Sequence, residues 1–306
     1  MRTLTKQQTG FTLVEMIMVI VITGIIGGIV AMFLRAPIQQ YMDVARRAEL
    51  TDIADTAVRR MARDVRTAVP NSVRPQGQST YVEFLPTRDG GRYRANSTGG
   101  AGGCAAVAGD SGGDALNFAA ADTCFEIIGT PITFYTGDQI VVGSTQSDGN
   151  PPYADCTLAP STCIRRAYNG AVGAGAPIVI VTSSTVLPAF AELDSQRFQV
   201  VDGTQQAVTY ACVGGGVDPT NGNGKGQLVR YWGYGFIPNP ANAEPPDFTG
   251  QITAPVSAIL ADKVSACEIT YEVPNQRFGL LAVRLTLTSG GESVSLYNEI
   301  HVNNAP

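Results

Sequence analysis

The sequence predicts an α+β protein, in which one long N-terminal helix, membrane-spanning in its first half, packs on an antiparallel β-sheet with long loops. Residues 11–34 form an almost continuous apolar run, and apolar residues then continue at helical spacing. From Arg197 onward, short segments rich in β-branched and aromatic residues alternate with turns. The 34 glycines and 18 prolines among 306 residues also favour a turn-rich body over a helical bundle.

The charge and histidine content argue against several classes of function. Charged residues make up 15% of the chain and the formal net charge is −5, so we expect no nucleic-acid-binding surface. The single histidine, His301, argues against most histidine zinc sites and catalytic triads. Faint oxygen-ligand patterns near Asp110 and Asp218 are interpreted as turns, with a calcium loop as the weaker alternative. We expect no enzyme activity, no cofactor and no metal.

Residues 11–34 are long enough to cross a membrane. A helix of this length spans about 36 Å, against about 30 Å for the hydrocarbon core. A secretory signal peptide has a shorter apolar region and a small-residue cleavage pattern, which the segment before Pro37 lacks, so we expect the span to be retained. Arg2 and Lys6 precede it without an acid, which favours a cytoplasmic N-terminus, although Arg35 and later arginines weaken that argument.

Glu15 is the exception within this apolar run. A carboxylate in a membrane is costly, and a place near the positive end of the helix dipole lowers that cost only in part. If the chain were cut before Phe11, a new α-amino group would lie four residues from Glu15. The amine of a neighbouring copy could then pair with this carboxylate as helices stack, which would set their axial register.

The segment Thr9-Gly10-Phe11-Thr12-Leu13-Val14-Glu15, followed by the apolar run, resembles the type III signal of type IV prepilins and type II secretion pseudopilins. The resemblance implies a leader peptide over residues 1–10, cleaved between Gly10 and Phe11 by a prepilin peptidase that also N-methylates Phe11. It further implies that Glu15 is the carboxylate that guides subunit assembly, and that the fold is type IV pilin-like. Val14 stands where isoleucine is common in the family.

The helix is expected to continue past the membrane to residue 68. Pro70 ends the helical pattern, and Pro37 is expected to bend the helix. Small residues within 24–31 either allow close packing against other helices or supply flexibility, and both alternatives stay open. Arginines lie mostly off the apolar stripe, which is marked at spacings of three and four by Leu50, Ile53, Ala57 and Met61.

Residues 69–306 are expected to form a periplasmic or extracellular β-rich body with a glycine-rich loop insertion at about 95–175. Residues 95–164 contain seven acids and no lysine or arginine, and seven of the residues in 99–116 are glycine. Such a composition suits neither a helix nor a central strand, so we expect a surface excursion there. Short strands are predicted at residues 80–85, 132–135, 139–142 and 177–182.

Clearer strand signals follow Arg197. Residues 198–201 and 207–212 flank Asp202-Gly203, which predicts a β-hairpin. An aromatic-rich strand is predicted at 227–236, and the segment Ser289-Gly290-Gly291-Glu292 predicts a tight hairpin turn between the last two strands. The final three strands are predicted at 266–273, 280–288 and 293–302.

All six cysteines lie in the body and none in the helix, a pattern typical of an exported protein with disulfides. Six cysteines allow 15 pairings. We expect neighbours to pair, as Cys104–Cys124, Cys156–Cys163 and Cys212–Cys267. The first two would pin the glycine-rich loops and the third would join two strands. Free thiols are the remaining alternative, and a metal site is disfavoured because the sequence has no C-x-x-C pair.

Further segments resemble minor pilins of the mannose-sensitive haemagglutinin (MSHA) pilus system, of the MshO type: residues 69–74, 82–86, 284–294 and 301–306. The resemblance implies a minor pilin that acts in pilus assembly initiation or at the tip. A J-like type II secretion minor pseudopilin is one alternative. A pilus-borne adhesin that binds through residues 95–164 is a second.

The same resemblance implies partners and a location. The partners are the prepilin peptidase/methyltransferase, the major pilin and other minor pilins through the N-terminal helix, and the inner-membrane assembly platform. The location is the inner membrane, with the N-terminus cytoplasmic and the body periplasmic, followed by the pilus or cell surface.

Overall fold

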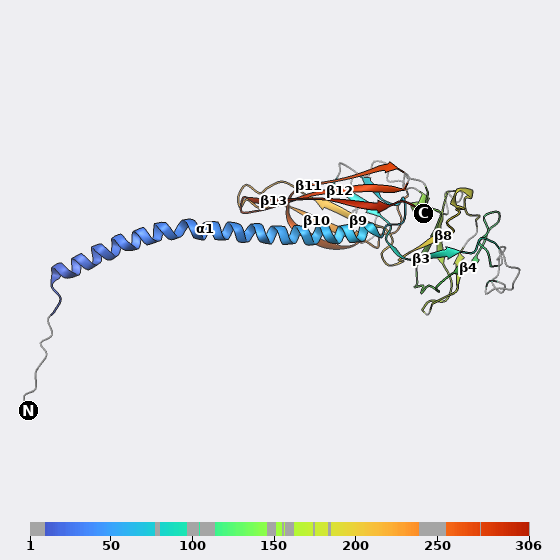
Figure 1. Ribbon diagram of the computed structural model, residues 1–306, viewed down its shortest axis with the longest axis horizontal. Helices are drawn as coiled ribbons and strands as arrows, with labels where there is room; N and C mark the ends of the chain where they lie inside the picture. The colour runs from blue at the N-terminus through green and yellow to red at the C-terminus, as the bar shows by residue number, and fades with distance from the viewer. Residues whose placement is uncertain are drawn as a thin grey trace, which may run out of the picture. The chain divides into compact units, whose positions relative to one another are not determined.

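The computed structural model describes residues 10–76, 80–96, 104, 114–145, 151–154, 156, 162–173, 175–182, 185–238, 255–275 and 277–305. These residues form one α-helix, two short 3₁₀ turns, a seven-stranded antiparallel sheet and a six-stranded closed barrel (Figure 1). This confirms the predicted α+β class. The chain divides into two compact units, Met1–Glu49 and Leu50–Pro306.

The first unit contains the N-terminal part of helix α1 (Leu13–Arg66), whose bounds lie close to the expected 11–68. The helix continues through Pro37 without interruption. Its side chains up to Met42 are exposed to solvent. Residues 1–9 of the expected leader lie outside the described residues.

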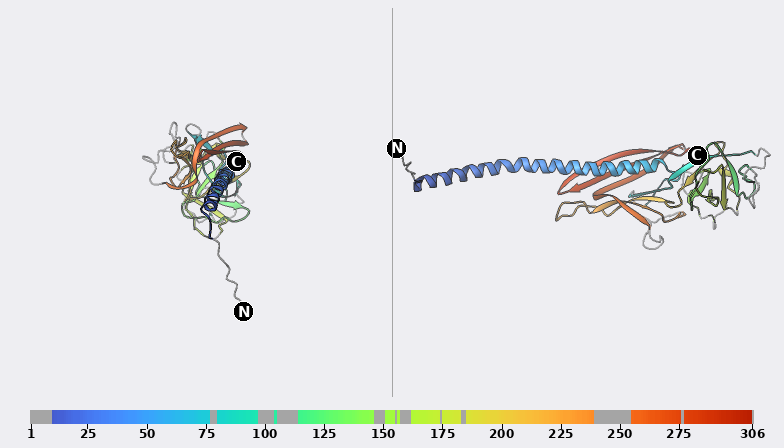
Figure 2. Two further views of the ribbon diagram at one scale, coloured as in Figure 1. Left: turned by 90° about the vertical axis from the view of Figure 1, so that its left-hand side faces the viewer. Right: turned by 90° about the horizontal axis from the view of Figure 1, so that it is seen from below.

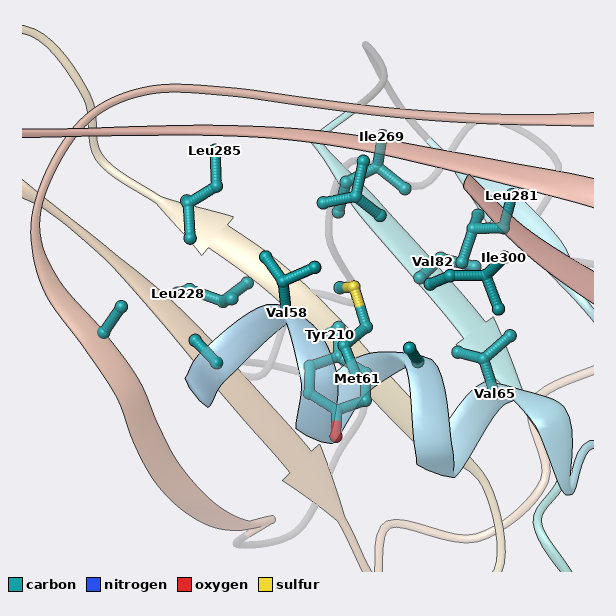
Figure 3. Close-up of a cluster of buried hydrophobic side chains, with 14 of the residues drawn as sticks. Val58, Met61, Val65, Val82, Tyr210, Leu228, Ile269, Leu281, Leu285 and Ile300 are labelled. Carbon is teal, nitrogen blue, oxygen red and sulfur yellow. The ribbon is translucent and has the colours of Figure 1, made fainter. Parts of the chain in front are cut away.

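The second part of α1 belongs to the hydrophobic core of the second unit. Its buried side chains recur every three or four residues and face the sheet (Figure 3). The predicted stripe residue Ile53 is only partly buried, but it packs against the same core. The buried helix residues are Leu50, Ala54, Ala57, Val58, Met61, Ala62 and Val65.

The sheet that covers this helix, called the sheet below, has the strand order β1-β2-β9-β10-β11-β12-β13. Apolar residues alternate on β12 with more exposed ones, as a sheet with one covered face requires. Ser289 pairs with Glu292 across Gly290 and Gly291, whose φ angles of 58° and 85° fit a two-residue hairpin turn, so the predicted turn is confirmed. The strands are β1 (Arg74–Gln76), β2 (Tyr81–Phe84), β9 (Val208–Val213), β10 (Gly226–Trp232), β11 (Val256–Asn275), β12 (Phe278–Ser289) and β13 (Glu292–Asn303).

The closed barrel, called the barrel below, was not predicted. The surface excursion was expected over the glycine-rich residues 99–116, of which the structure describes only Cys104 and residues 114–116. Three strands within the expected insertion at 95–175, β4, β5 and β6, close a barrel with β3, β7 and β8 in the order β3-β4-β7-β6-β5-β8, and its green ribbons are seen in Figure 2. The predicted strand at 132–135 forms only an isolated bridge, from Ile132 to Ala176. The strands are β3 (Thr87–Tyr93), β4 (Cys124–Ile128), β5 (Gln139–Val142), β6 (Arg165–Tyr168), β7 (Ile178–Thr182) and β8 (Arg197–Val201).

Aromatic side chains explain why this glycine-rich region can close on itself. Tyr93, Phe125, Phe134 and Phe198 are almost fully buried inside the barrel. Phe125 contacts Phe198 edge to face with ring centroids 5.4 Å apart, a favourable aromatic geometry. Of the glycine-rich residues 99–113, only Cys104 is described.

The predicted hairpin around Asp202-Gly203 is also wrong. β8 pairs with β3 and β5 of the barrel, whereas β9 pairs with β2 and β10 of the sheet. The turn itself exists, because the Asp202 carbonyl accepts hydrogen bonds from the backbone N–H groups of Gln205 (3.2 Å) and Gln206 (2.8 Å). The chain therefore uses this turn to pass from the barrel into the sheet.

Apolar packing and disulfides hold the second unit together. A third cluster of buried residues combines Val141 and Val201 of the barrel with Val69 after the helix and Ala207 before β9. The structure joins Cys212 of β9 to Cys267 of β11, and its other disulfides are Cys104–Cys124 and Cys156–Cys163. These are the pairs expected from the order of the cysteines, and the first links a loop residue to barrel strand β4.

Candidate functional site

The candidate site lies at the start of α1. Gly10 and Phe11 precede the first helical residue, Leu13, and both are exposed. The peptide bond between them is therefore outside the helix, where its backbone is accessible. Phe11 is 83% exposed, which is unusual for a phenylalanine that has no partner outside its own chain.

Thr12 caps the helix. Its hydroxyl oxygen accepts a hydrogen bond from the backbone N–H of Glu15 at 3.3 Å, and its carbonyl oxygen accepts one from the N–H of Met16 at 3.2 Å. This is the N-cap hydrogen bond of a threonine, in a sequence with the T-x-x-E spacing of a capping box. We did not predict this role for Thr12, although the T-x-x-E spacing of the sequence carries the signal.

The start of the helix is a favourable place for the negative charge of Glu15. The carboxylate lies in the first turn of α1, where the unpaired N–H groups and the helix dipole favour negative charge. That local benefit is modest, at about 0.3–1 kcal/mol for such a charge. It does not by itself account for a glutamate at the start of a long apolar surface.

The apolar surface that follows is not covered by the described part of the chain. α1 contains an 18-residue window with a mean hydropathy of 2.8, and none of that window is buried. By length and composition the helix is able to cross a membrane. An apolar surface of this extent in water is unfavourable, so its cover has to come from lipid or from other helices.

The glycines of this segment are not required by packing within the chain. A Cβ atom added at Gly24, Gly27 or Gly28 would meet nothing within 4 Å. The neighbouring Thr23 satisfies its hydroxyl within the helix by donating to the carbonyl of Val19 at 2.6 Å. The three small residues therefore leave a face on which a second helix can approach closely.

The other residues considered from the sequence have structural surroundings. The side-chain carboxylate of Asp218 accepts a hydrogen bond from the backbone N–H of Thr220 at 2.8 Å, and its backbone carbonyl accepts one from the N–H of Gly222 at 2.8 Å. Asp218 is therefore a turn residue. His301 is exposed on β13, edge to face with Phe278. Within the residues that the structure describes, no group of three or more His, Cys, Asp or Glu side chains is placed to hold a metal ion. Asp110 lies outside those residues.

Comparison with known proteins agrees with the geometry of the N-terminus. The family model described as the prokaryotic N-terminal methylation motif matches residues 5–31, which include Gly10, Phe11 and Glu15. No curated protein and no solved structure matches the chain. The motif supports a place for this chain among the type IV pilins and pseudopilins, which are structural subunits and not enzymes.

Proposed function

We propose that the protein is a minor pilin of an MSHA-like type IV pilus, which acts when assembly begins or at the pilus tip. The observation that carries the proposal is the match of residues 5–31 to the methylation motif. The exposed apolar helix that follows the motif supports it. The resemblance of residues 69–74, 82–86, 284–294 and 301–306 favours the MSHA system over a J-like pseudopilin of type II secretion.

Proteolytic processing creates the α-amino group of Phe11 with which Glu15 pairs. Prepilin peptidase cleaves between Gly10 and Phe11 on the cytoplasmic side and methylates the new amino group of Phe11. The subunit waits in the inner membrane through residues 11–34, with its body in the periplasm. Cleavage leaves Thr12 in place, so the helix keeps its cap while the leader is lost.

Assembly then uses a charge pair inside an apolar bundle. The Glu15 carboxylate of one subunit pairs with the Phe11 amine of the next, where the low dielectric makes the attraction strong. The uncovered glycine face at Gly24, Gly27 and Gly28 allows neighbouring helices of the major pilin and other minor pilins to pack closely. A body that carries both a sheet and a barrel suits the end of a filament better than a repeated position along its shaft.

The experiment is mass spectrometry of the N-terminal peptide of the protein from membrane and pilus fractions. We expect a peptide that begins at methylated Phe11. An intact Met1 in cells with a working prepilin peptidase would contradict the proposal and leave a signal-anchored protein.

Glu15→Gln tests the charge separately from the cap. Glutamine keeps a side chain that suits a capping box, so the helix start is preserved while the negative charge is removed. We expect processing to continue and incorporation into pili to fall at least about tenfold, because a desolvated charge pair is lost. Immunoblots of sheared pili and of membranes measure the two outcomes.

The matched control is Asp43→Asn, which removes an acid from the same helix. Asp43 pairs locally with Arg46 at 3.3 Å on the exposed surface, so we expect normal incorporation. Normal incorporation of the Glu15→Gln variant would refute the pairing role of Glu15.

A further inference from the structure

A polar cavity of about 510 Å³ lies in the second unit. It is lined by the last turns of α1, the first residues of β3, the turn after β8, and β10. Its volume falls within the range of about 300–1,000 Å³ that is usual for small-molecule sites. Most of its lining side chains are polar, so an apolar ligand would leave their hydrogen-bonding groups unpaired.

Three arginines from different elements converge on this cavity: Arg60 of α1, Arg88 of β3 and Arg230 of β10. Arg230 donates from Nε to Asp64 (2.9 Å) and from Nη2 to Gln205 (2.6 Å). Arg88 pairs with the buried Asp138, while its own side chain stays 23% exposed. Arg60 is exposed and forms no ion pair with the described part of the chain.

The two carboxylates in the lining already accept hydrogen bonds. Asp64 accepts from the hydroxyl of Tyr210 at 2.8 Å and from Arg230. Asp202 accepts from the N–H and hydroxyl of Thr204 at 2.7 and 2.6 Å. Burial alone would raise the pKa of Asp202, but these hydrogen bonds and the charge of Arg88 outweigh it and lower that pKa. The lining contains three arginines and two aspartates, an excess of one formal positive charge, which suits an anionic ligand.

The remaining lining adds hydroxyl groups and an aromatic ring. Thr67, Thr87 and Thr204 line the cavity together with the indole of Trp232. The guanidinium carbon of Arg230 lies 4.9 Å from the Trp232 ring centroid, which orders the indole beside the charged groups. An indole offers an apolar surface next to a polar environment, and so suits a ring that has apolar faces and polar edges.

We propose that this cavity binds a sugar acid, a small polyhydroxylated carboxylate. Arg60 and Arg88 bind the carboxylate, threonine hydroxyls and the Gln205 amide bind ligand hydroxyls, and the Trp232 indole contacts the ring of the ligand. The assignment does not rest on the proposed pilin function, because no residue of the cavity lies within residues 5–31.

The chain offers a direct probe of this site, because Trp232 is its only tryptophan. We would titrate the full-length protein in detergent micelles with glucuronate and follow tryptophan fluorescence, with glucose and inorganic phosphate as parallel ligands. We expect a saturable change with glucuronate, and at least about tenfold weaker binding of glucose and phosphate. No saturable change with glucuronate would overturn the proposal, as would equal binding of glucose or of phosphate.

Two variants on the same helix sharpen the test. Arg60→Gln removes an exposed guanidinium from the cavity and should not disturb folding. We expect it to weaken glucuronate binding about tenfold or more, since hydrogen bonds between charged groups are lost. Arg63→Gln removes another exposed arginine of the same helix, which does not line the cavity, and we expect unchanged binding. If both variants weakened glucuronate binding equally, or if neither weakened it, Arg60 would not be a ligand-binding residue.

Discussion

The two parts of helix α1 have similar secondary structure but opposite environments. From Leu13 to Met42 the apolar side chains are exposed, whereas from Leu50 to Val65 they are buried beneath the sheet. Removing apolar surface from water is favourable by about 25 cal/mol per Å², whether the same chain, another chain or lipid covers that surface. The second part obtains that cover from its own chain. The first part needs lipid or neighbouring helices to supply that cover.

The largest expected effect comes from a matched pair of methionines on these two parts. Met61 is fully buried in the core, and Met18 is 58% exposed. We expect Met61→Ala to lower the free energy of unfolding of the body by about 2–5 kcal/mol, because it removes buried atoms and leaves a cavity. Met18→Ala should leave that free energy unchanged.

Denaturant unfolding of the full chain in detergent, followed by Trp232 fluorescence, measures both variants. A similar loss of stability in the two variants would contradict this expectation, since it would mean that the first part of the helix also packs in the folded body.

A smaller difference is expected between two ion pairs. Asp64 and Arg230 lie 2.9 Å apart with side-chain exposures of 23% and 8%, whereas Asp43 and Arg46 lie 3.3 Å apart with exposures of 43% and 39%. Asp64→Ala should cost about 1–3 kcal/mol, because it leaves buried donors of Arg230 and Tyr210 without their acceptor.

Asp43→Ala should cost no more than about 0.5 kcal/mol, as is usual for exposed helix pairs. The same unfolding assay applies. Equal costs would indicate that burial does not distinguish the two ion pairs.

The smallest effect is a change of stability in alkali. Burial, together with the nearby Asp64, raises the pKa of Tyr210. A group whose pKa is raised by folding contributes stability that is present below its unfolded pKa and is lost above it. The wild-type body should therefore lose stability as the pH rises above about 10, by at most about 1.4 kcal/mol per pH unit from this group.

Tyr210→Phe isolates that contribution. The variant lacks the hydroxyl that binds Asp64, so it should be less stable at neutral pH. Its deficit relative to wild type should shrink between about pH 10 and 11. Tyr41→Phe, in the exposed part of the helix, should run parallel to wild type throughout. A constant deficit for Tyr210→Phe would contradict the assignment.

Local patterns predicted the elements whose signals are local. The apolar spacing in α1 predicted its buried stripe at Leu50, Ala57 and Met61, and Gly290-Gly291 predicted the β12–β13 turn. The N-cap role of Thr12 was missed, although its T-x-x-E spacing is also local. The motif that includes Gly10, Phe11 and Glu15 was visible because its residues are contiguous, and the family match covers it.

The pairing of the strands could not be predicted from local sequence. Asp202-Gly203 indicates a turn, but the choice between a hairpin and a passage from barrel to sheet depends on which strands approach from elsewhere. The barrel was not predicted for the same reason, because its strands are short and are separated by glycine-rich segments. Its closure depends on aromatic contacts such as the one between Phe125 and Phe198, which are 73 positions apart in the chain.

Hydrophobic periodicity and contiguous residues were sufficient to predict the long apolar helix, its glutamate and methylation motif, and the turn-rich strands with their cysteines. The folded structure was needed to show that the body contains a barrel as well as the sheet. It also brought Arg60, Arg88, Arg230 and Trp232 to one cavity. The barrel and the cavity both depend on contacts between residues far apart in the chain, and the free energy of such contacts cannot be predicted from local sequence patterns.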